Sequence, residues 1–355
     1  MTMSAVIESM RERMPWQAVG RMILVREGVN VGRGWDNTIE KLAESKVQLP
    51  EGKLEDALEE HNLCGEKFVK LYRVDDEDRL ALQEKIKLLE VVENGFSSAY
   101  PKSVPSDAIN DLSGVPKLVD VVQNDDGVGA VYAHATRLTT RVHIDLDQIL
   151  EDPSALEALY DEVVGLKYRN VQLFSVIWVP HNFPYVEIRS DLPAGMTMDL
   201  VHGIQKQIRL ICNELGAVEL VDPIDLFPVL DAVYDADGEG TVVELSFTTT
   251  SASVKNEKMR RSGLDLRKEP YHIHGKKGLG TPIEPFRMFV RWKVPLGDNV
   301  VSAPEMGLIG TSRGRSTVGL PGAVGMSGAV VRNCVGLADY GRVLEVIHKY
   351  LGQST

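Results

Sequence analysis

Apolar and polar residues alternate with the two-residue period of a β-strand in five segments of the chain. These segments are Lys67–Val74, Arg137–Leu146, Tyr185–Arg189, Thr241–Thr250 and Phe286–Val294. A sixth segment, Val171–Val179, is apolar on both faces, which is typical of a central strand. The pattern therefore predicts a sheet in which Val171–Val179 is buried and Tyr185–Arg189 is its hairpin partner.

Five other segments favour helices, either by an apolar stripe at helical spacing or by their charged, helix-favouring composition. They are Leu54–His61, Asp76–Glu93, Ser154–Gly165, Thr197–Leu215 and Leu337–Leu351. The strongest is Thr197–Leu215, where Leu200, Ile204 and Ile208 fall on one face and Gly216 is placed to end the helix.

These elements predict an α+β fold, with a mixed or antiparallel sheet and helices packed on one of its faces. Residues 1–125 form a mainly helical N-terminal module, and the turn sequence Asn124–Gly127 marks its boundary. Residues 126–300 form the α+β core domain, which includes a basic loop at 255–285. Residues 301–355 combine a glycine-rich segment with the C-terminal helix.

Composition excludes several classes of protein. With 43% hydrophobic and 25% charged residues, the 355-residue chain resembles a globular protein rather than a disordered one. The three cysteines, at 64, 212 and 334, are far apart, odd in number and lack a CxxC pair, so they indicate neither a zinc site nor a disulfide framework. We expect a cytoplasmic protein without a membrane partner, because the N-terminus lacks a signal-peptide pattern and no apolar run approaches the roughly 18 residues of a membrane span.

Charge is distributed unevenly along the chain. The net charge is −12, yet residues 255–293 carry eleven Lys or Arg against four Asp or Glu. A local basic patch in an acidic protein is the electrostatic footprint of a polyanion partner. Candidate phosphate ligands in this stretch are Lys255, Lys258, Arg260, Arg261, Arg267, Lys268, His272, His274, Lys276 and Lys277.

Two rows of cations extend this interpretation. Arg137 and Arg141 share one face of a predicted strand, and Arg287 and Arg291 share one face of another. If both strands present the same face of one sheet, we expect the four arginines to be exposed and close together, with Phe289 available to stack on a base. Ordinary cross-strand ion pairing is the alternative reading of these rows.

Other chemistry has weaker support. His272 and His274 point the same way if they lie on a strand, but no third metal ligand has a diagnostic spacing, so neither a metal nor a cofactor is expected. The acidic residues between 222 and 239 lack the ligand pattern of a calcium loop. The segment Gly310–Thr317 has glycines and hydroxyls but no P-loop lysine.

The sequence therefore predicts a non-catalytic nucleic-acid-binding component of a larger assembly, which contacts phosphates through the basic loop and a basic sheet face. Two alternatives stay open: a self-assembling structural protein that uses the basic loop between subunits, and a metal-dependent phosphoesterase or nuclease. The sequence leaves open whether the protein has any catalytic activity, what its oligomeric state is, and whether its polyanion is DNA, RNA or an acidic protein surface.

Overall fold

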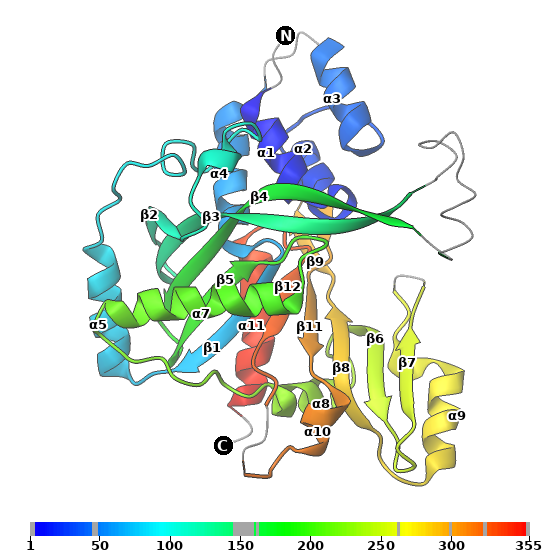
Figure 1. Cartoon of the computed structure of the whole chain (residues 1–355). Coiled ribbons are helices and arrows are strands. Elements are labelled where there is room, and N and C mark those ends of the chain that lie inside the picture. The colour runs from blue at the N-terminus through cyan, green and yellow to red at the C-terminus, as the bar shows by residue number, and fades with distance from the viewer. Residues whose placement is uncertain are drawn as a thin grey trace.

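The computed structural model describes residues 4–44, 49–144, 160, 163–260, 263–297, 300–321 and 325–352. Its centre is a ten-stranded sheet with the order β2-β3-β4-β5-β1-β12-β11-β8-β6-β7, in which every neighbouring pair is antiparallel (Figure 1). This confirms the predicted α+β class. A separate two-stranded ribbon pairs β9 (Val294–Gly297) with β10 (Val300–Ser302).

The main-sheet strands have the following bounds: β1 (Lys67–Arg73), β2 (Lys117–Gln123), β3 (Gly127–His143), β4 (Val164–Pro180), β5 (Tyr185–Asp191), β6 (Thr241–Thr248), β7 (Val254–Lys258), β8 (Glu284–Arg291), β11 (Glu305–Ile309) and β12 (Ala329–Arg332). The described helices are α1 (Ala5–Arg13), a π-helix (Trp16–Gly20), α2 (Arg21–Arg26), α3 (Gly34–Glu44), α4 (Glu51–Cys64), α5 (Asp76–Lys87), α7 (Met198–Glu214), α8 (Phe227–Asp235), α9 (Pro270–Leu279), α10 (Ser312–Ser316) and α11 (Leu337–Leu351), with short 3-10 turns at Ile109–Asp111 and Leu266–Lys268.

Helices cover both faces of the sheet, whereas the sequence led us to expect them on one. The reason is visible in β1, which is apolar at both alternations. Phe68 and Tyr72 pack toward α7 on one face, and Val69 and Leu71 pack toward α8 and α11 on the other. Because a strand in the middle of the sheet buries both faces, each face needs its own helical layer.

The three predicted segments share this one sheet. β1 and β2 come from residues 1–125 and β11 and β12 from residues 301–355, and β1 lies between β5 and β12 at the centre. The N-terminal helices α1, α2 and α4 form an apolar cluster of their own, which includes Leu54 and Leu58, and α4 also contacts α11 and β4. The turn at Asn124–Gly127 is a tight hairpin that joins β2 to β3. It therefore connects two strands of the same sheet and does not separate two structural units.

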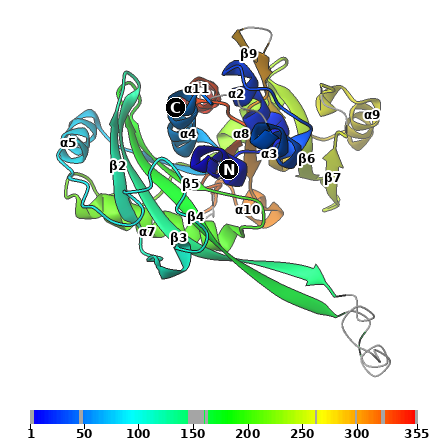
Figure 2. The ribbon, with the colours of Figure 1, turned by 90° about the horizontal axis from the view of Figure 1, so that it is seen from above.

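The hairpin of β3 and β4 extends beyond the sheet as a projecting arm (Figure 2). The two strands pair over their full 17 residues, but β3 pairs with β2 only up to Ala133, and β4 pairs with β5 only from Ser175 onward. Residues 137–143 and 164–170, which we call the arm, therefore have no lateral neighbour in the sheet. Seven residue pairs at about 3.4 Å per residue give the arm a length of roughly 24 Å.

Three predicted elements differ from the structure. The helix predicted over Asp76–Glu93 ends at Lys87. The basic loop at 255–285 contains β7, a 3-10 turn and α9. In the predicted helix Ser154–Gly165, Val164 and Gly165 belong to β4, and residues 154–159 lie outside the described part of the chain.

Candidate functional site

The two arginine rows do not share a surface. Five strands lie between β3 and β8 in the sheet, and Arg137 and Arg141 lie on the arm, beyond the part of β3 that pairs with β2. The expectation that these rows converge with Arg287 and Arg291 is therefore wrong. Two-residue alternation assigns a residue to a face of its strand, but it carries no information on which strands are neighbours.

The β8 row is an ion-pair ladder. Arg287 Nε lies 2.9 Å from Glu244 Oε1, and Arg291 Nη2 lies 2.6 Å from Glu305 Oε2. Glu305 is completely buried, and its other oxygen accepts a hydrogen bond of 2.7 Å from Arg332 Nε. Phe289 is also buried, so it does not offer a face to a base. Both arginines of β8 act within the fold.

Arg267 also has a structural role. Its guanidinium donates to the carbonyl oxygens of Val233, Ala236 and Gly240 at 3.0, 2.7 and 2.9 Å, and it binds both carboxylate oxygens of Asp265. Burial alone would raise the pKa of Asp265, but the guanidinium holds this pKa below its usual range. Arg267 thereby joins the end of α8 to the start of β6. All the N–H groups of its guanidinium are used within the protein, so none is free to bind a phosphate.

His272 and His274 lie on a helix and point in different directions. His272 is buried, with Nδ1 at 2.7 Å from Glu257 Oε2 and Nε2 at 2.9 Å from the Tyr234 hydroxyl, whereas His274 is exposed. Helix signals were present in the sequence. Pro270 occupies the first turn, the Glu269 side chain accepts from the backbone N–H of His272, and Gly280 ends the helix at φ +65°.

The remaining cations of the basic stretch are divided. Lys258 pairs with Glu244 at 3.0 Å, Lys268 pairs with Asp237 at 3.3 Å, and Lys276 Nζ donates to the Tyr234 hydroxyl at 3.1 Å. Exposed cations for which the described residues supply no ion pair are Lys255, Arg260, Lys277 and Lys293. Arg261 lies outside the described residues. This region is therefore a weaker polyanion surface than its sequence predicted.

The arm is the more strongly basic element. It carries four exposed cations and no acidic residue, and none of the four forms an ion pair with a described residue. They are Arg137, Arg141, Lys167 and Arg169. In the strand register Arg137 and Arg141 lie opposite Asn170 and Leu166, and Lys167 and Arg169 lie opposite Thr140 and Leu138. Each face of the arm therefore presents two cations.

The arm face with Arg137 and Arg141 also presents an apolar row from β4. Tyr168, Leu166 and Val164 are 51%, 54% and 45% exposed, and the Arg137 guanidinium lies 3.8 Å from the centre of the Tyr168 ring. The apolar–polar pattern did not single out Lys167, Tyr168 and Arg169 as candidate ligands. Their signal, a run of cations around an aromatic residue, was hidden because the preceding residues were read as a helix.

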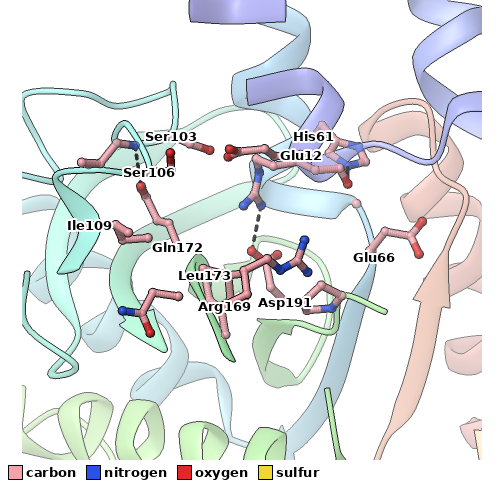
Figure 3. Close-up of a pocket in the computed structure, with 16 residues that line it drawn as sticks. Glu12, His61, Glu66, Ser103, Ser106, Ile109, Arg169, Gln172, Leu173 and Asp191 are labelled. Atoms are coloured by element: carbon pink, nitrogen blue, oxygen red, sulfur yellow. Dashed lines mark hydrogen bonds and ion pairs between the residues drawn. The ribbon is translucent and has the colours of Figure 1, made fainter. Parts of the chain in front are cut away.

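A cavity of about 150 Å³ lies at the base of the arm, enclosed by α1, the end of α4, residues 103–109 and strands β4 and β5 (Figure 3). An ion-pair network forms its floor. Arg13 Nη2 lies 2.8 Å from Asp191 Oδ2, and Lys67 Nζ lies 2.6 Å from Asp191 Oδ1. Burial alone would raise the pKa of Asp191, but Arg13 and Lys67 hold it below its usual range.

Three buried polar atoms of the cavity lining have no hydrogen-bond partner among the described residues: Arg13 Nε, His61 Nδ1 and Gln172 Nε2. The Gln172 amide is oriented by its oxygen, which accepts from the Val104 N–H at 2.8 Å, so its NH₂ group is the free end. Burial lowers the pKa of His61 to about 3, and its Nε2 lies 3.4 Å from the Arg13 carbonyl oxygen. Neutral His61 therefore donates there and keeps an acceptor at Nδ1.

Carboxylates surround the same cavity. Glu12 and Glu66 line it together with Asp191, and burial raises the pKa of both glutamates. Across the described residues, no group of three or more His, Cys, Asp or Glu side chains is arranged to hold a metal ion. None of the helices described is long and apolar enough to cross a membrane.

Comparison with known proteins gives no relative: no family model, no curated protein and no solved structure matches this chain.

Proposed function

We propose that this protein is a non-catalytic nucleic-acid-binding protein that contacts its ligand through the arm. The observation that carries the proposal is the charge of the arm: Arg137, Arg141, Lys167 and Arg169 are exposed without a carboxylate among the arm residues, in a chain of net charge −12. Exposed cations that have no ion pair with a described residue can release counterions from a polyanion when they bind it, and this supplies affinity without requiring a sequence.

The face with Arg137 and Arg141 favours a single strand. Its arginines stand beside the exposed ring of Tyr168, so a basic row runs next to an aromatic and apolar row. Proteins that bind single strands combine these two features, a cationic track for phosphates and aromatic side chains for bases. A duplex is the alternative form of the ligand, because a two-stranded β-ribbon fits the major groove of B-DNA and would use the cations of both faces.

Lys255 and Lys277 provide a secondary contact in this proposal. Both are exposed, on β7 and α9, and β7 is the edge strand at the other end of the sheet order from β2 and β3. We therefore assign the main share of binding to the arm.

Self-assembly is the second candidate function. The apolar row of the arm, with Val164 and Leu166 about half exposed, also suits a protein partner, and a basic arm complements the acidic remainder of a second copy. In this case the ligand of the arm is another molecule of the same chain.

The test measures binding of fluorescein-labelled 20-nucleotide dT, rU and duplex DNA by fluorescence anisotropy between 50 and 200 mM KCl. The arm variant is Arg137→Glu with Arg141→Glu. The control is Lys85→Glu with Lys117→Glu, which changes the net charge equally at exposed positions on α5 and β2. We expect the arm variant to lose roughly tenfold or more in affinity and to show a shallower salt dependence, while the control binds like the wild type.

Two outcomes contradict the proposal. If the wild type binds no probe at 50 mM KCl, the protein is not a general nucleic-acid binder. If the two charge variants lose affinity equally, binding does not depend on the arm. Light scattering after size-exclusion chromatography at 50 and 500 mM KCl tests the second candidate, because an arm-mediated assembly gives a mass above that of the monomer in the wild type and not in the arm variant.

A further inference from the structure

The cavity and the arm are continuous. Arg169 and Asn170, the last arm residues of β4, also line the cavity, and Val171, Gln172 and Leu173 continue its wall into the sheet (Figure 3). A strand that lies along the arm therefore passes the mouth of the cavity. Because arm residues form part of the cavity lining, a group that projects from a ligand on the arm can enter the cavity.

The three polar atoms without partners indicate which hydrogen-bonding groups a ligand in the cavity must carry. Arg13 Nε and Gln172 Nε2 are donors, and His61 Nδ1 is an acceptor. Buried polar atoms without partners are costly, so a ligand that satisfies them gains affinity. A group that satisfies all three must carry acceptors and a donor together. The edge of a nucleobase has both, whereas a phosphate dianion has acceptors alone.

Charge points the same way. The three carboxyl groups of Glu12, Glu66 and Asp191 line the cavity against the two guanidinium groups of Arg13 and Arg169, and Arg13 is already bound to Asp191. With Lys67 in the floor, three cations face three carboxyl groups, so an anion in this cavity meets no excess of positive charge. Phosphates are therefore retained on the arm, where carboxylates are absent, and a neutral polar group enters the cavity.

Size limits the ligand to one ring system. The volume of about 150 Å³ is below the roughly 300–1,000 Å³ of pockets that hold drug-sized molecules. Val104, Ile109 and Leu173 give the cavity apolar walls between its polar atoms. Apolar walls with a few placed polar groups are the arrangement that holds an extruded base, which pairs through its edge and packs through its faces.

We infer that the cavity receives a single base, unstacked from a nucleic-acid strand that lies on the arm. This inference rests on the proposed function, because the arm must hold the strand before a base can enter. The base edge takes the free donors of Arg13 and Gln172 and the free acceptor of His61.

The test compares binding of four 12-nucleotide chains: dT, dA, dC and a base-free deoxyribose-phosphate chain of the same charge. Two variants address the cavity. Gln172→Leu removes one free donor together with the acceptor of the Val104 N–H, and Ser106→Trp narrows the mouth from an exposed position of the lining without touching that hydrogen bond. Ser98→Trp, exposed and outside the lining, is the control for the added ring. Far-UV circular dichroism and thermal unfolding establish that each variant is folded.

We expect the wild type to prefer at least one base-carrying chain over the base-free chain, and both cavity variants to reduce this preference about tenfold, with the salt dependence unchanged. The Arg137→Glu, Arg141→Glu variant, in contrast, loses affinity for all four chains. If Ser106→Trp and Gln172→Leu keep the wild-type preference, the cavity does not receive a base and the arm proposal stands. If the wild type binds none of the chains, the proposed function fails, and this inference fails with it.

Discussion

Lys67 Nζ lies 2.6 Å from Asp191 Oδ1 in the interior of the protein, where the Lys67 side chain is fully buried and that of Asp191 is 6% exposed. β1 and β5 bring the two residues directly opposite each other in the register of the sheet. Asp191 is fully used: its second oxygen accepts from Arg13 Nη2 and from the Phe174 N–H. This cluster joins the N-terminal helix α1 to the centre of the sheet.

Replacing Lys67 by methionine should destabilise the protein strongly. The variant keeps the apolar stem but leaves one Asp191 oxygen without its cation, and breaking a buried ion pair from one side costs about 3–5 kcal/mol. We expect the low end of this range, because Arg13 still contacts Asp191. Urea unfolding followed by fluorescence measures the difference. Lys117→Met, at an exposed position of β2, should stay within about 0.5 kcal/mol of the wild type; equal losses in the two variants would contradict this account.

Arg267→Lys should also lower the free energy of unfolding, by about 2–3 kcal/mol. A lysine ammonium lacks the planar fork that reaches three carbonyls and Asp265 together, so buried acceptors lose their donors. The measurement is chemical denaturation, with Lys277→Ala as the exposed control. Nucleic-acid affinity per folded molecule should not change. A loss of nucleic-acid affinity in a fully folded Arg267→Lys protein would show that Arg267 contacts the ligand.

His134 should make the protein sensitive to acid. It is buried on β3 with no hydrogen-bond partner on either ring nitrogen among the described residues, and burial lowers its pKa to about 4. The unfolded chain has a histidine pKa near 6.5. Between that pH and about 4, His134 is protonated in the unfolded state but stays neutral in the folded state. The unfolding free energy therefore falls as pH drops from about 6.5 to about 4, by up to about 1.4 kcal/mol per pH unit from this residue.

His134→Leu removes this contribution. Urea titrations at pH 8, 6, 5 and 4.5 should show the variant losing less stability than the wild type as pH falls, with a constant difference between the two proteins above pH 7. His61 keeps part of the acid sensitivity in both proteins, because burial lowers its pKa to about 3. Parallel curves over the whole pH range would mean that the pKa of His134 is the same in the folded and the unfolded protein.

Local pattern predicted much of the fold. The helix over Leu337–Leu351 and the strand over Lys67–Val74 were set by spacing alone, and Gly216 ends α7 at φ +71° as predicted. The neighbours of each strand could not be predicted from local pattern, because the pairing of β1 with β5 joins residues more than a hundred positions apart. Residues 255–285 show a second limit. Their cations suggested a loop, although Pro270 and Gly280 delimit a helix.

The candidate site was predicted in part for the same reason. Arg137 and Arg141 were found because two-residue alternation puts them on one strand face. Lys167 and Arg169 were not, since recognising them requires the pairing of β4 with β3. The acceptors that pair with Arg267, Arg287 and Arg291 are set by tertiary contacts, and a count of charges along the chain does not contain them.

Tyr168 and Arg141 should contribute to binding in different ways. If single strands lie on the arm, Tyr168→Ala removes a stacking platform and weakens binding of 20-nucleotide dT by about 1–3 kcal/mol at every salt concentration. Arg141→Gln removes one phosphate contact and reduces the slope of log affinity against log salt by about 0.7. Tyr168→Phe is the matched control, because it keeps the ring beneath Arg137 and should bind like the wild type. Anisotropy titrations at four KCl concentrations separate the two effects. A Tyr168→Ala protein that binds dT as tightly as Tyr168→Phe would mean that bases do not stack on the arm, and would favour a duplex held by the cations of both faces.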